Sequence, residues 1–211
     1  MNPTVTRRAI YELPANVTLS FAAHPSKLQD WVNEARAQGH EVLIELPMDS
    51  INFNPNEPGA LRTLRVNSTP ASNIKNLDWL LGQAQGYFAV TNYNGDLLVR
   101  RSDILAPILT HLSDSGLGFV YDGSTQAPAL NSLSASLDLP FFEAFTLLDT
   151  NTDAASIGVE LLRLEQDAIN GTTPIGVGFA FNNTIDQVSL WVSELERKNI
   201  ELAPASFALN K

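Results

Sequence analysis

The apolar positions of this 211-residue chain follow two alternating patterns. Short and almost continuous apolar runs, typical of strands buried on both faces, occur at residues 17–21, 42–46, 87–90, 117–121, 141–148, 175–179 and 200–203. Segments with apolar residues at helical spacing precede and separate these runs, at residues 4–12, 25–39, 73–84, 102–116, 128–137, 153–170 and 183–198. The pattern predicts one α/β domain, residues 1–211, of about seven helix-then-strand units with parallel strands.

Two architectures fit this alternation, a closed (β/α) barrel and an open doubly wound sheet. The first predicted element is a helix, although a crossover helix normally connects a preceding strand to the strand beside it. We therefore expect that a first strand before Asn2 is missing from the chain. We also expect a longer form that includes this strand to be more stable, because its absence leaves an unpaired sheet edge.

Composition and charge exclude several classes of function. The net charge is −10 and the sequence pI is about 4.6, which makes nucleic acid and anionic membrane surfaces poor partners. The chain has no cysteine, which excludes disulfides, thiolate metal sites and cysteine nucleophiles. No apolar run approaches the ~18 residues that a transmembrane helix requires, and no signal peptide is recognisable. The oligomeric state is left open.

Polar residues at predicted strand ends are the candidate site, because α/β folds bind ligands at the carboxyl ends of their strands. The turn that contains Asn92, Tyr93 and Asn94 ends one apolar run, and its Asn and Gly residues are equally typical of a plain turn. Asp122 ends another run, where it acts either as a general base or as an Asx-turn acid.

Glu45 is the single polar residue inside the apolar run at residues 42–46. A buried carboxylate is costly unless it is paired, so we expect Glu45 to face the mouth of the fold with a polar or basic partner. Asp49 follows on an irregular, proline-rich stretch at residues 47–72, whose length is typical of a functional loop. Asp49 is either the partner of Glu45 in an acid/base pair or an isolated solvated acid, and we favour the second interpretation.

Several segments, in order along the chain, resemble the divergent polysaccharide deacetylases (family 2). GHEVLIELPMD at residues 39–49 and PGAL at residues 58–61 are similar to that family's GHEVLLHLPME…PGPGAL. The other matches, with the family's form in parentheses, are VTNYNG at 90–95 (VNNHMGS), YDGST at 121–125 (LDSRTT), IGVGF at 175–179 (IAIGHP) and IELAPAS at 200–206 (IELVPVS).

The resemblance implies an incomplete (β/α) barrel of the carbohydrate-esterase type, related to chitin and peptidoglycan deacetylases. It also implies a bacterial protein of the periplasm or cell envelope that acts on a polysaccharide or oligosaccharide. Enzymes of this type remove acetyl groups with a divalent metal, usually zinc, held by histidine and carboxylate ligands at strand ends. The family's acidic pair ends the first strand, which lies outside this chain.

The sequence departs from the family at its histidines. Tyr93 stands at the histidine of the VNNHMGS turn, and Phe179 stands at that of IAIGHP, or Ala180 if the register slips by one. Among the three histidines of the chain, His111 lies at the end of a helix's apolar face, where we expect a structural or surface role, and His40 is expected at the amino end of a strand. His24 follows the first strand at the correct end and is therefore the weak remaining metal candidate.

Two hypotheses follow from these residues. The first is a catalytically degenerate relative of the deacetylases that binds or scaffolds carbohydrate without a cofactor. Its ligand would contact Glu45, Asp49 and the residues of an aromatic and amide face, which are Asn92, Tyr93, Asn94 and Phe179. The second is a metal-dependent hydrolase that removes N- or O-acetyl groups from a cell-envelope polysaccharide, with zinc held by His24 and carboxylates or with catalysis rebuilt around Asp122. We favour the first.

Overall fold

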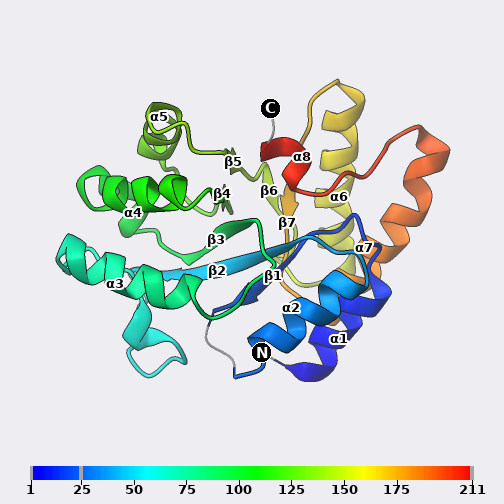
Figure 1. Ribbon diagram of the computed structural model, residues 1–211. Helices are drawn as coiled ribbons and strands as arrows, with labels where there is room; N and C mark the ends of the chain where they lie inside the picture. The colour runs from blue at the N-terminus through cyan, green and yellow to red at the C-terminus, as the bar shows by residue number, and fades with distance from the viewer. Residues whose placement is uncertain (1, 24–25, 210–211) are drawn as a thin grey trace.

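The computed structural model describes residues 2–23 and 26–209, which form an α/β fold (Figure 1). Two groups of parallel strands make up its sheets. The larger sheet contains β1 (Leu19–Ala22), β2 (Val42–Met48), β3 (Ala89–Asn94), β4 (Gly118–Tyr121) and β5 (Phe141–Glu143). The smaller sheet contains β6 (Thr146–Leu147) and β7 (Gly176–Val177).

Helices precede or separate the strands, as the apolar pattern predicts. The α-helices are α1 (Pro3–Glu12), α2 (Leu28–Ala37), α3 (Pro70–Leu81), α4 (Ser102–Asp114), α5 (Pro128–Ser136), α6 (Ala154–Ile169), α7 (Asn182–Leu195) and α8 (Ser206–Leu209). The short 3-10 helices are η1 (Ala60–Arg62), η2 (Leu98–Arg100) and η3 (Glu196–Lys198). Side chains cap the amino ends of three helices. Asn2, Thr69 and Asp153 each accept a hydrogen bond from a backbone N–H in the first turn of α1, α3 and α6, respectively.

The larger sheet has the order β1-β2-β3-β4-β5, all parallel. A doubly wound sheet reverses its strand order at a switch point, and the described sheets contain no such reversal, so that alternative is wrong. An unreversed order with the helices outside is compatible with a barrel wall, and closure of the barrel stays a prediction.

The expectation of seven strands in one wall is not confirmed. The predicted strand at 141–148 is divided, because its first part pairs with β4 and its second part pairs with β7, and the chain bends between them. The predicted strand at 200–203 is not a strand. Side chains hold this stretch beside β1: the Asn16 amide donates to the Leu202 carbonyl at 2.9 Å, and Thr18 Oγ1 accepts from Ala205 N at 2.9 Å.

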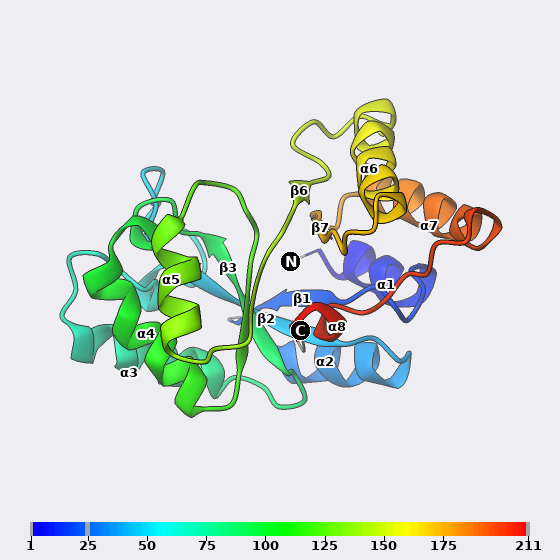
Figure 2. The ribbon, with the colours of Figure 1, turned by 90° about the horizontal axis from the view of Figure 1, so that it is seen from above.

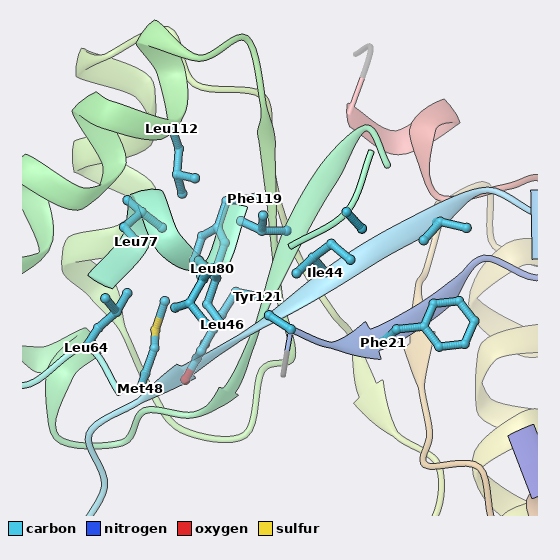
Figure 3. Packing of buried hydrophobic residues seen from close by; sticks show 14 of the residues in the cluster. Phe21, Ile44, Leu46, Met48, Leu64, Leu77, Leu80, Leu112, Phe119 and Tyr121 are labelled. Carbon is cyan, nitrogen blue, oxygen red and sulfur yellow. The ribbon is translucent and has the colours of Figure 1, made fainter. Parts of the chain in front are cut away.

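The two faces of the larger sheet differ sharply. The row Phe21, Ile44, Val90, Phe119 and Phe141 is in register across all five strands and packs in the main hydrophobic core (Figure 3). The next row is Ala22, Glu45, Thr91, Val120 and Phe142, on the opposite face. Helices α2 to α5 cover the first row, whereas α6 and α7 lie on the side of the second row (Figure 2). Most of the second row borders a cavity, and we call the face that carries this row the inner face; the lining residues are Ala22, Glu45, Thr91 and Val120.

Two of the three histidines have structural contacts. His40 is buried, with its Nδ1 2.8 Å from the Val17 carbonyl and its Nε2 2.9 Å from the Ile10 carbonyl, so it joins α1 to the start of β1. His111 on α4 lies 2.7 Å from a carboxylate oxygen of Asp78 on α3. The contact with Asp78 fits the structural or surface role predicted for His111, and the amino-end position predicted for His40 is confirmed.

Candidate functional site

A cavity of about 1270 Å³ lies along the inner face of the larger sheet and extends to the carboxyl ends of its strands. This volume exceeds the roughly 300–1,000 Å³ of typical ligand pockets. At the carboxyl ends, which we call the mouth, the cavity is lined by six of the predicted site residues, together with loop residues from the stretch after β2. Those six residues are Glu45, Asn92, Tyr93, Asn94, Asp122 and Phe179.

Glu45 stands on the inner face of β2 and borders the cavity. Ser20 of β1 donates a hydrogen bond from its hydroxyl to Glu45 Oε1 at 2.9 Å. Burial raises the pKa of Glu45, and the Ser20 hydrogen bond opposes this shift in part. The prediction that Glu45 faces the mouth with a polar partner is therefore confirmed in position and in partner. Its role in binding stays a prediction.

Tyr93 ends β3 with 40% of its surface exposed at the mouth. The turn that presents it has left-handed backbone at Asn94 (φ 58°) and at Gly95 (φ 115°), which the Asn-Gly sequence tolerates. Burial raises the pKa of the Tyr93 hydroxyl, and the nearby carboxylates of Glu57 and Glu45 raise it further. The hydroxyl is therefore neutral at physiological pH and lies within the electrostatic influence of two acids.

The side chain of Asn92 joins the ends of β3 and β4. Asn92 Oδ1 accepts a hydrogen bond from Asp122 N at 2.9 Å, and Asn92 Nδ2 donates to the Asn94 carbonyl at 2.7 Å. The amide of Asn92 thus fixes the two turns of the mouth. Asp122 Oδ1 accepts from Ser124 N at 2.9 Å, which is the Asx-turn geometry that the sequence allowed. Catalysis by Asp122 stays a prediction.

Asp49 corrects one expectation, because it is not a solvated acid. Its side chain is 3% exposed and is not part of the cavity wall. Its Oδ2 accepts from Val66 N at 3.2 Å, and the Arg65 guanidinium lies 3.8 Å from Oδ1. The Asp49 carbonyl also accepts from Leu97 N and Leu98 N. Since its carboxylate ties the loop after β2 to the strand end, we assign Asp49 a structural role.

Phe179 is 49% exposed at the mouth, and its ring lies 5.9 Å from that of Phe181. Asp149, which follows β6, fixes its backbone. Asp149 Oδ2 accepts from Phe179 N at 2.7 Å and from Thr184 Oγ1 at 2.8 Å. Burial raises the pKa of Asp149, and these two hydrogen bonds oppose the shift. Asp149 is thus the buried support of the aromatic residue that the sequence predicted at the site.

Sequence reasoning missed three residues of this site: Ser20, Glu57 and Asp149. Ser20 alternates with Leu19 and Phe21 in β1, so a period-two pattern was the available signal. Asp149 follows an apolar run, as Asp122 does. Glu57 lies in the irregular stretch after β2, where no periodicity predicts which side chain turns toward the cavity.

The described residues do not fit a catalytic metal. In residues 2–23 and 26–209, no three His, Cys, Asp or Glu side chains gather in a group that could hold an ion. His40 and His111 have the structural contacts given above. The weak metal candidate His24 lies outside the described residues, so its prediction is not tested. At the two positions where the family resemblance implies histidines, the mouth carries the rings of Tyr93 and Phe179.

Comparison with known proteins decides the family. The profile of the divergent polysaccharide deacetylases matches residues 2–209. The chain belongs to this family. A solved structure of an uncharacterized protein from Agrobacterium tumefaciens C58 is similar to this family member, with 31% sequence identity and a TM-score of 0.93. The match covers 98% of this chain and 84% of that one.

A more distant solved structure shares only the fold with this deacetylase-family protein. It is a candidate cellobiose-phosphate cleavage protein from Enterococcus faecalis V583, with 11% identity, a TM-score of 0.65, and coverage of 98% of this chain and 94% of that one. No curated protein matches the chain. Among the helices of the described residues, none is both long enough and apolar enough to cross a membrane.

Proposed function

We propose that this member of the divergent polysaccharide deacetylase family binds a neutral glycan of the bacterial cell envelope without deacetylating it. Family membership supports a carbohydrate ligand. The shape of the site supports a chain-like ligand, because the cavity is open at its mouth and continues along the inner face of the sheet. The alternative, a metal-dependent deacetylase, needs a ligand set that the described residues do not supply.

One observation carries the proposal. Tyr93 and Phe179 occupy the positions at which the resemblance implies metal-binding histidines, and both rings line the same cavity while about half exposed. Exposed aromatic faces are suited to the apolar C–H faces of sugar rings, and a tyrosine adds a hydroxyl for a hydrogen bond. Where the resemblance implies metal-binding histidines, this chain would therefore use two aromatic rings that stack on a sugar.

Polar groups around the rings match sugar hydroxyls. Glu45 and Asp122 border the cavity and can accept hydrogen bonds, and the Tyr93 hydroxyl can donate one. No Lys or Arg side chain accompanies these groups at the mouth within the described part of the chain; the cavity's one lysine, Lys198, is paired with Glu165. A neutral ligand is therefore favoured over an anionic one.

Calorimetric titration of metal-stripped protein with N-acetylated chitooligosaccharide tests this function. We expect binding without added metal, and we expect Tyr93→Ala and Phe179→Ala each to weaken it about tenfold, which corresponds to the loss of one aromatic contact. Tyr11→Ala and Phe145→Ala are the matched controls, because both residues are exposed and neither lines the cavity. These controls are expected to bind like the parent protein.

The enzyme alternative has its own measurement. Zinc is titrated into the same protein, and acetate release is measured with and without it. Stoichiometric zinc binding below micromolar concentration, or zinc-dependent acetate release that His24→Ala abolishes, would establish the metal-dependent hydrolase instead. Absence of chitooligosaccharide binding by the parent protein, or binding that both aromatic variants leave unaltered, would remove the binding proposal.

A further inference from the structure

The loop that follows β2 forms one wall of the mouth. Its two ends are joined, because Met48 and Leu64 form a parallel bridge and Asp49 N donates to the Leu64 carbonyl at 2.9 Å. The segment between these ends is a compact loop of the omega type. Its middle part borders the cavity, with Phe53 and residues 57–60 among the lining residues. The loop is therefore closed at its base and turns its middle toward the cavity.

Phe53 of this loop is not explained by core packing. It is half-buried, yet in residues 2–23 and 26–209 it belongs to none of the hydrophobic clusters and is not among the half-buried side chains that pack against them. A phenylalanine contributes to stability mainly by burying its surface in such a cluster. An aromatic ring that borders the cavity instead is available to a ligand.

Arg65 holds the ring of Phe53 in place. The guanidinium carbon of Arg65 lies 3.9 Å from the centre of the ring, a distance at which a cation is attracted to the aromatic face. The same guanidinium lies 3.8 Å from Asp49 Oδ1, at the base of the loop. Arg65 covers one face of the ring but does not border the cavity. The opposite face of Phe53 is therefore the one left to a ligand.

This wall adjoins the aromatic residues already described at the mouth. Pro47, just before the loop, is in register with Tyr93 of β3. Burial, and next to it the Glu57 carboxylate of the loop, raise the pKa of the Tyr93 hydroxyl, so Glu57 lies within electrostatic range of it. Phe179 borders the same cavity from the segment after β7. Three aromatic residues thus line one cavity from three different elements.

A pyranose ring has two faces, so a single sugar can stack on two aromatic rings at most. A third ring is of use only to a ligand of two or more sugar units. We propose that Phe53, held by Arg65, is a further stacking position of the glycan site, and that it makes the site select an oligosaccharide over a single sugar. This inference rests on the proposed glycan function. Asn54 and Glu57, which also border the cavity, can form hydrogen bonds to the hydroxyls of the added sugar.

Titration of metal-stripped protein with two ligands, N-acetylglucosamine and tetra-N-acetylchitotetraose, tests this selection by NMR chemical shifts. We expect the parent protein to bind the tetrasaccharide at least about tenfold more tightly than the monosaccharide, and Phe53→Ala to weaken the tetrasaccharide about tenfold, which corresponds to one aromatic contact. The monosaccharide should change less than about twofold, because the other two rings remain. Phe53→Leu keeps an apolar side chain without the aromatic face and should behave like Phe53→Ala.

The chain offers a matched control outside the cavity. The Arg62 guanidinium lies 4.6 Å from the Trp79 ring in the same arrangement, and neither residue borders the cavity. Trp79→Ala and Arg62→Met should therefore bind both ligands like the parent protein. Arg65→Met should weaken only the tetrasaccharide, by about threefold, and Arg65→Lys should restore its binding because it keeps a cation beside the ring.

Each outcome separates this inference from the glycan function on which it rests. Tetrasaccharide binding that both Phe53 variants leave unaltered, or an equal loss for the two ligands, would overturn the inference and leave glycan binding by Tyr93 and Phe179 in place. A monosaccharide bound as tightly as the tetrasaccharide, or a Trp79→Ala variant as weak as Phe53→Ala, would also overturn it. Equal weakening by Arg65→Lys and Arg65→Met would contradict the positioning role of Arg65. Absence of tetrasaccharide binding by the parent protein would remove both proposals.

Discussion

The two faces of the same five strands have opposite character. On the outer face, Ile44 and Phe119 are completely buried between the sheet and the helices that cover it. On the inner face, one residue later in each strand, Glu45 and Thr91 border a cavity. Because successive side chains of a strand point to opposite faces, each strand contributes to both environments at once.

Each strand therefore has one face whose residues contribute mainly to stability and one face whose residues are available for binding. The outer row is close-packed, so a deleted methylene there leaves a void that the surroundings cannot fill. The inner row already borders open volume, so polar groups such as Ser20 and Glu45 remain available to a ligand. We therefore expect substitutions on the outer face to affect folding, and substitutions on the inner face to affect mainly the site.

The largest expected effect comes from two adjacent residues of β2. We expect Ile44→Ala to lower the free energy of unfolding by about 4 kcal/mol, because Ile44 is fully buried in the outer row. Leu43→Ala should cost only about 2 kcal/mol, because Leu43 borders the cavity and its removal enlarges an existing space. Urea unfolding followed by circular dichroism measures both; equal losses, or a larger loss at Leu43, would contradict the two-face description.

We expect effects of intermediate size from substituting two acids at strand ends, Asp49 and Asp122. Asp49→Ala should lower the free energy of unfolding by about 1–3 kcal/mol, because it leaves the partly buried Val66 amide without its acceptor. Asp122→Ala, at the mouth, should change stability by less than about 1 kcal/mol and should weaken chitooligosaccharide binding. Thermal melts and calorimetry distinguish the two variants. A stable Asp49→Ala variant with impaired glycan binding would return Asp49 to the site.

Much of this fold could be predicted from its apolar pattern, because buried parallel strands and amphipathic helices have strong local signals. The divided strand at 141–148 could not be predicted, since its bend arises where the pairing partner changes from β4 to β7. The stretch at 200–203 has a strand-like sequence, but side chains of Asn16 and Thr18 hold it in place of a ladder.

The candidate site shows the same division between local and distant causes. Glu45 was recognisable because it interrupts an apolar run. Tyr93 and Phe179 were found through the family resemblance, which places both at strand ends. The burial of Asp49 depends on Val66 of the loop after β2 and on Leu98 of η2, which are not its neighbours in sequence. No local pattern distinguishes such an acid from a solvated one.

The smallest expected effect concerns the charge of Glu45. Burial raises the pKa of this carboxyl above that of the unfolded chain, so its ionised form destabilises the folded state. Below the unfolded pKa both states are protonated and this cost is absent; it appears as the pH rises through the folded pKa. In Glu45→Gln, a neutral oxygen can still accept the Ser20 hydroxyl.

We therefore expect Glu45→Gln and the parent protein to have similar unfolding free energies at acidic pH, with the variant becoming relatively more stable as the pH rises to neutrality. Urea unfolding across that pH range measures the difference, with Glu196→Gln on exposed η3 as a control that should follow the parent protein at every pH. A difference that is constant with pH, or one in which the parent protein gains on the variant as the pH rises, would mean that Glu45 is ionised without cost. The Glu45 carboxylate would then be well solvated on the inner face of β2, and its ionisation would not destabilise the folded state.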